Sequence, residues 1–222
     1  MSPRPFERPA TIALPELPGL PMGSSLDGLW LPEHGDGGPR GAAVIAAPHP
    51  QMGGSMDSPV ATELALASSD LGFVSLRFNW RGIGASAGVA SGEMVDAVVD
   101  YRAALSFVED SVDGAVIACG YSWGALAAAR VCFDAPRVRK LILVAPPPEM
   151  LDGPALARRG VPMLVVVGDR DPYVPLDALR EVLGQIEGSK LVVLQGVDHF
   201  FMNGLPDVGE AIRSWLESRS ER

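Results

Sequence analysis

Residues 116–127 read VIACGYSWGALA, an apolar run that ends in the pentapeptide GYSWG at 120–124 and passes directly into alanine-rich sequence. The apolar run predicts a buried strand, and the alanine-rich segment predicts a helix. A G-x-S-x-G pattern between a strand and a helix is typical of a nucleophile elbow, a tight turn that pushes the serine hydroxyl out above a sheet. Side chains at positions 120 and 124 would collide with such a turn, which explains the two glycines. Ser122 is therefore the first candidate nucleophile.

The composition of the chain fits one domain with a large core. The chain has 222 residues, of which 47% are hydrophobic. No linker is apparent after residue 40, so we expect residues 1–222 to form a single α/β domain, with the proline-rich residues 1–10 as a flexible arm. The formal net charge of −9 argues against a surface for nucleic acids or for anionic membranes, because it would repel both.

The apolar runs, the N-terminal segment and the cysteines together favour a cytoplasmic protein. No run approaches the ~20 apolar residues that a membrane span needs. The N-terminal segment has no continuous apolar region of the kind found in signal peptides. The two cysteines, Cys119 and Cys132, show no disulfide pattern and are expected to be reduced thiols in the core.

Short apolar runs alternate with helical patterns along the chain. Strands are expected at 11–14, 26–31, 42–47, 73–78, 115–119, 141–145, 163–167 and 191–194. Helices are expected at 60–71, 93–108, 125–133, 176–186 and 208–218. Strands that are apolar throughout and alternate with helices indicate a mostly parallel central sheet of about eight strands with helices on both faces. Functional groups in such sheets lie beyond the carboxyl ends of the strands.

A serine becomes a good nucleophile when a base takes its proton and a third group orients the base. The chain offers three histidines, and His199 follows the last predicted strand, whereas His34 lies in a polar loop and His49 ends an earlier strand. Two carboxylates, Asp169 and Asp171, follow the predicted strand at 163–167 in a proline-rich turn. Either aspartate is a candidate acid on this pattern alone, and the other is expected to be a turn residue.

Four motifs together resemble the α/β-hydrolase superfamily, over nearly the whole chain. They are PHPQMGG at 48–54, RFNWRGIGAS at 77–86, GYSWG at 120–124 and DHFF at 198–201. Their combination is similar to that of small lidless bacterial serine hydrolases and esterases. The resemblance implies a Ser-Asp-His order along the chain, which Ser122, Asp171 and His199 match, and it assigns the acid to Asp171.

The resemblance also implies two backbone donors for an oxyanion. One is the N–H of Trp123, directly after the candidate nucleophile, and the other comes from the loop after the third strand. Pro50 has no N–H, so the pattern points to Gln51. Pro50 stands where a glycine is commoner in this loop, and we interpret His49 as a structural residue beneath it.

The expected site is open and shallow. Caps in this superfamily usually lie between the sixth and seventh strands, where only residues 146–161 are available here, so no cap domain fits. A substrate pocket is expected from Met52, Gly53, Phe200 and Met202. No metal motif is apparent, and the turn at 81–84 lacks the lysine of a phosphate-binding loop, so no cofactor is expected.

The sequence therefore predicts a carboxylesterase that cleaves small or short-chain esters through an acyl-enzyme. A thioesterase, a peptidase or an acyltransferase with the same triad is the first alternative. A non-catalytic binding protein on the same fold is the second. The expected partner is a small-molecule ester, and the chain is expected to be a monomer or a homodimer.

Overall fold

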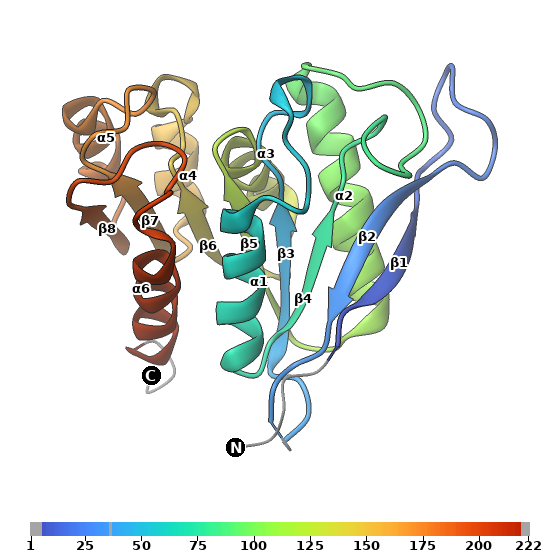
Figure 1. The fold of residues 1–222 in the computed structure, drawn as a ribbon, viewed down its shortest axis with the longest axis horizontal. Helices are drawn as coiled ribbons and strands as arrows, with labels where there is room; N and C mark the ends of the chain where they lie inside the picture. Colours follow the sequence, from blue (N-terminus) through green and yellow to red (C-terminus); the bar gives the residue numbers. More distant parts are fainter. Residues whose placement is uncertain (1–5, 36, 219–222) are drawn as a thin grey trace.

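An eight-stranded sheet forms the centre of the computed structural model, which describes residues 6–35 and 37–218 (Figure 1). Its strands are β1 (Arg8–Ala13), β2 (Ser25–Leu31), β3 (Gly41–Ala46), β4 (Val74–Phe78), β5 (Ala115–Tyr121), β6 (Val138–Val144), β7 (Met163–Gly168) and β8 (Ser189–Leu194). They lie in the order β1-β2-β4-β3-β5-β6-β7-β8. Strand β2 runs antiparallel to both neighbours, and every other neighbouring pair is parallel. The expectation of a mostly parallel sheet of about eight strands is confirmed.

Six α-helices accompany the sheet in the part of the chain that the structure describes. They are α1 (Pro59–Asp70), α2 (Met94–Ser111), α3 (Trp123–Val131), α4 (Gly153–Arg159), α5 (Leu176–Leu183) and α6 (Leu205–Ser218). Helices α1 and α6 pack together on one face, and α2 and α3 pack together on the other (Figure 1). Parallel crossovers are right-handed, so the path from β3 through α1 to β4 and the reverse path through α2 to β5 place these helices on opposite faces. Because both faces are covered, β3, β4 and β7 are buried at every position.

The N-terminal boundary differs from the expectation. Strand β1 begins at Arg8 and pairs with β2, so residues 8–10 belong to the sheet and not to an arm. Pro9 is compatible with this position because β1 is an edge strand, where one side of the backbone needs no partner. Residues 1–5 of the expected arm lie outside the described residues. Among those described, no helix combines the length and hydropathy that crossing a membrane would require.

The topology places a crevice at the carboxyl ends of β3 and β5. The chain leaves β3 towards β4 on one side and returns to β5 on the other, and ligands bind at such switch points in open α/β sheets. The loop after β3 contains a short 3-10 helix, η1 (Pro50–Met52), and α3 begins directly after β5. Between β6 and β7, the described chain forms only the short 3-10 helix η3 (Pro148–Met150) and α4, so this connection holds no cap domain.

Candidate active site

The turn between β5 and α3 holds Ser122 in a strained conformation. Its φ and ψ are 54° and −115°, a region that residues other than glycine rarely adopt. The backbone N–H of Ser122 donates to the carbonyl of Val144 at 2.8 Å, which fixes the turn to the neighbouring strand β6. A Cβ on Gly120 would overlap the carbonyl group of Gly124, and a Cβ on Gly124 would overlap the carbonyl oxygen of Ala46. Glycine is thus required at both positions by close backbone contact.

Ser122, His199 and Asp171 lie in one chain of hydrogen bonds. The Nε2 atom of His199 is 3.1 Å from the Oγ of Ser122, and its Nδ1 is 2.6 Å from the Oδ2 of Asp171. The Asp171 side chain is fully buried, and its Oδ1 accepts the backbone N–H of Tyr173 at 2.8 Å. A carboxylate in this position holds the ring proton on Nδ1, which leaves Nε2 free to accept the proton of a hydroxyl.

Asp169, the other aspartate of this turn, has a different environment. It is exposed, and its Oδ1 accepts the backbone N–H of Gly196 at 2.6 Å. Its own N–H donates to the carbonyl of Leu194 at 3.0 Å. Asp169 therefore links the loop after β7 to the loop after β8, whereas Asp171 forms a hydrogen bond with His199.

The two candidate oxyanion donors differ in whether their N–H groups already have a hydrogen-bond acceptor in the protein. Trp123 is the first residue of α3, so its N–H has no acceptor within the helix and lies at the partly positive helix end. The N–H of Gln51 donates to the Nδ1 of His49 at 3.2 Å, and the His49 ring packs against the Trp123 ring with centroids 4.7 Å apart. Burial lowers the pKa of His49, which favours the neutral ring that can accept this bond.

The 77–86 motif holds both ends of the loop that carries Gln51. The Nε1 of Trp80 donates to the carbonyls of Ala47 and Pro48 at 3.1 and 3.0 Å. The Oδ1 of Asn79 accepts the N–H of Met56 at 2.8 Å. These contacts join residues that are far apart in the sequence, so the sequence pattern gave no sign of them.

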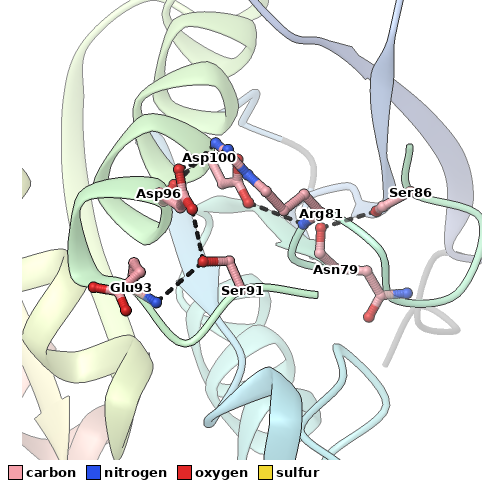
Figure 2. Close-up of polar contacts among 7 residues, drawn as sticks. All are labelled: Asn79, Arg81, Ser86, Ser91, Glu93, Asp96 and Asp100. Carbon is pink, nitrogen blue, oxygen red and sulfur yellow. Dashed lines mark hydrogen bonds and ion pairs between the residues drawn. The ribbon is translucent and has the colours of Figure 1, made fainter. Parts of the chain in front are cut away.

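Arg81 of the same motif fixes the next turn to α2. Figure 2 shows its guanidinium facing Asp96 and Asp100, which it contacts at 2.8 and 2.7 Å. The Oδ2 of Asp100 also accepts the backbone N–H of Arg81 at 2.9 Å. Burial raises the pKa of Asp100, and the hydrogen bonds from Arg81 oppose that shift. The arginine of this turn is thus paired with carboxylates of the chain itself.

An apolar cavity of about 460 Å³ opens beside Ser122. All four expected pocket residues line it, namely Met52, Gly53, Phe200 and Met202. Within residues 6–35 and 37–218, no aspartate, glutamate, lysine or arginine lines this cavity. Over the same ranges, no group of three or more histidine, cysteine, aspartate or glutamate side chains is arranged to hold a metal ion.

Comparisons with known proteins agree with this architecture. A family model described as serine aminopeptidase, S33, matches residues 52–159, and one described as TAP-like protein matches residues 120–220. An uncharacterized protein of Rickettsia prowazekii is 27% identical over 185 residues, which are 78% of this chain and 77% of that protein.

Two solved structures resemble nearly the whole chain. An α/β serine hydrolase homologue from Coxiella burnetii is 32% identical with a TM-score of 0.80, and the match covers 94% of this chain and 97% of that one. A serine hydrolase without a lid from Xanthomonas campestris is 28% identical with a TM-score of 0.81, covering 96% of this chain and 94% of that one. The family models, the sheet order and these similarities lead to one conclusion: the chain belongs to the α/β-hydrolase superfamily.

Proposed function

We propose that this protein is a serine hydrolase that cleaves carboxylic esters. The observation that carries the proposal is the hydrogen-bonded series from Ser122 to His199 to Asp171, at 3.1 and 2.6 Å, beside an open apolar cavity. Both distances are within the reach that proton transfer and orientation of the base require.

Each residue has a defined role in the proposed reaction. The Oγ of Ser122 attacks the ester carbonyl while the Nε2 of His199 accepts its proton. The tetrahedral intermediate then expels the alcohol, which takes that proton from Nε2, and an acyl-enzyme remains. Asp171 stabilises the imidazolium and keeps the ring in its orientation. Water, activated by His199 in the same way, releases the acid and restores Ser122.

Two backbone donors stabilise the oxyanion in this proposal. The N–H of Trp123, the first residue of α3, has no acceptor inside its helix. The N–H of Gln51 is the second donor, and it must leave the Nδ1 of His49 to reach a substrate oxygen. Each such donor typically contributes about 3 kcal/mol to transition-state stabilisation.

The cavity favours neutral esters over the substrates of an aminopeptidase. An aminopeptidase has to bind the charged α-ammonium group of a peptide, and a carboxylate is the side chain that does so. No aspartate or glutamate of the described chain lines the cavity. Aromatic and sulfur-containing side chains form a large part of its lining, including Tyr121, Trp123 and Met52.

A fluorophosphonate probe tests the nucleophile. We expect the probe to label the wild-type protein and to leave Ser122→Ala unlabelled. Turnover of matched butyrate esters, thioesters and anilides then identifies the bond, with the ester expected to have the highest kcat/KM. Labelling that persists in Ser122→Ala would refute the assignment of the nucleophile. A higher kcat/KM for the anilide than for the ester would indicate a peptidase instead of an esterase.

A further inference from the structure

The mouth of the cavity carries large apolar side chains that the fold leaves in solvent. Met52, Phe200 and Met202 are 77, 62 and 80% exposed, although each lines the cavity. Exposed apolar side chains are common singly, but a cluster of them around a concave site marks a binding surface. These three side chains are therefore placed to contact a substrate and contribute little to the core.

Sheet order places these side chains on two sides of Ser122. Ser122 follows β5, which lies between β3 and the pair β7 and β8. Met52 lies in the loop after β3. Tyr173 lies in the loop after β7, and Phe200 and Met202 lie in the loop after β8. We call these two sets the β3 wall, formed by Met52, and the β8 wall, formed by Tyr173, Phe200 and Met202.

The proposed chemistry decides which half of an ester meets which wall. The leaving alcohol takes its proton from the Nε2 of His199, so its oxygen must lie within hydrogen-bond reach of that atom. The rings that flank His199 belong to the β8 wall, with centroids 4.9 Å away for Tyr173 and 5.8 Å away for Phe200. With the alcohol half placed beside His199 and the β8 wall, the other apolar side of the cavity, the β3 wall, is left for the acyl chain.

The charges of the side chains around the cavity also restrict the class of substrate. No charged aspartate, glutamate, lysine or arginine side chain lines the cavity within the described ranges, and the chain carries a formal net charge of −9. A carboxylate or a phosphate on either half of the ester would lose its hydration without gaining a cation. A neutral aromatic group instead gains edge-to-face contacts with Tyr173 and Phe200.

We infer that the site selects uncharged esters, with an aromatic alcohol group against the β8 wall and an aliphatic acyl chain against the β3 wall. The inference rests on the proposed function, because the direction of the ester follows from His199 as the proton donor. Met52 and Phe200 are thus specificity-determining residues for opposite halves of the substrate.

Two series of substrates test the two walls independently. The alcohol series compares benzyl, ethyl and 4-carboxybenzyl acetate, and the acyl series compares ethyl hexanoate with ethyl acetate. We expect Phe200→Ala to lower the benzyl-to-ethyl ratio of kcat/KM by about fivefold, because the ring that contacts the alcohol is lost, and to leave the hexanoate-to-acetate ratio unchanged. Met52→Ala is expected to do the reverse. In the wild type, the 4-carboxybenzyl ester is expected to react at least about tenfold more slowly than the benzyl ester.

Met22→Ala is the matched control, because it truncates a side chain that is 87% exposed and lies in the β1–β2 hairpin, outside the cavity. It is expected to change neither ratio. Phe200→Ala and Met52→Ala variants that change both ratios equally, or neither ratio, would overturn the inference while leaving ester hydrolysis intact.

Binding to the Ser122→Ala variant tests the walls without turnover. Benzyl butyrate is expected to shift the NMR signal of the Trp123 indole N–H, with a weaker affinity when Phe200→Ala is added. If the wild type hydrolyses no ester, the proposed function fails. The inference on the walls then depends on this titration, and an affinity unaffected by Phe200→Ala would overturn it.

Discussion

The hydroxyl of Tyr121 donates a hydrogen bond of 2.7 Å to the backbone carbonyl of His199, across 78 residues of sequence. Tyr121 directly precedes Ser122, so this bond links the backbone of the candidate base to the turn of the candidate nucleophile. Burial raises the pKa of Tyr121, with the Asp171 carboxylate acting in the same direction, so the hydroxyl keeps its proton and remains a donor. Tyr121 is therefore a positioning residue in the proposed site.

Tyr121→Phe removes this donor and keeps the ring. A hydrogen bond of this kind contributes about 1 kcal/mol, so we expect kcat to fall about fivefold while KM stays unchanged. Tyr101→Phe is the control, because the Tyr101 hydroxyl is also buried and bonds to the carbonyl of Val44 at 2.7 Å. That hydroxyl also accepts the backbone N–H of Cys119 at 3.0 Å, so Tyr101→Phe is expected to lower the unfolding free energy by at least as much, with kcat retained. Equal kcat values for the two variants would reduce Tyr121 to a purely structural role.

Gln51→Pro removes the second proposed oxyanion donor, because proline has no N–H. Losing one such donor costs about 100-fold to 1,000-fold in kcat, and we expect a loss in that range. Gln51→Ala keeps the N–H and loses the side-chain bond to the carbonyl of Ala90, so its kcat is expected to stay within about threefold of wild type. Circular dichroism melting should show both variants folded. A Gln51→Pro variant with the kcat of Gln51→Ala would exclude this N–H from catalysis.

Backbone strain at Ser122 predicts a gain in stability when activity is lost. Its φ of 54° and ψ of −115° suit glycine, and such a conformation costs other residues about 1–3 kcal/mol. Ser122→Gly and Ser122→Ala both lack the hydroxyl and are expected to lose turnover. After the entropic cost of glycine, we expect Ser122→Gly to exceed Ser122→Ala by about 1 kcal/mol in urea unfolding. The opposite order would mean that the turn is not strained.

The buried pair of Arg81 and Asp100 predicts a large loss of stability. Arg81→Met leaves the Asp100 carboxylate, which is 1% exposed, without its guanidinium partner, and breaking such a pair costs about 3–5 kcal/mol. We expect Arg81→Met/Asp100→Asn to be more stable than Arg81→Met in urea unfolding at neutral pH. A loss that is simply additive over the two positions would contradict the pairing.

The pH dependence of this variant has a defined sign. Burial raises the pKa of Asp100 above its usual value, so the folded chain binds its proton more readily than the unfolded chain. Without Arg81, that difference grows, and stability falls as the pH rises through the folded pKa. We therefore expect the deficit of Arg81→Met relative to wild type to shrink as the pH is lowered from neutral, because the buried carboxyl is then protonated more readily in the folded chain.

The sequence predicts the sheet well because β3 to β7 are short apolar runs separated by clear turn residues. It predicts the start of β1 poorly, since Pro9 and Arg8 disfavour a strand locally and only pairing with β2 overrides them. Helix α3 begins at Trp123, two residues before the expected start, because the turn at Ser122 is tighter than helix propensity alone indicates.

The candidate triad follows from motifs, since its members occupy fixed places after strand ends. Its supporting contacts do not follow from them. The bonds from Tyr121 to His199 and from Trp80 to the loop after β3 join distant segments with no local pattern. The hydrogen bond from the Gln51 N–H to the Nδ1 of His49 depends on the orientation of the imidazole ring, which only a folded structure defines.

The connection between β6 and β7 is short and is anchored to the fold through Arg159, which donates to the carbonyls of Cys132 and Val138 at 2.9 and 3.0 Å. Helix α4 has its own cap at Asp152, whose Oδ1 accepts the N–H of Ala155 at 2.9 Å, and it ends at Gly160 with a φ of 63°. Pro147, which precedes this helix, already lines the cavity. A longer segment inserted after Pro147 would begin at the edge of the cavity that contains Ser122, outside the strands of the sheet. The fold thus offers protein engineers one insertion point for changing substrate access independently of the catalytic groups.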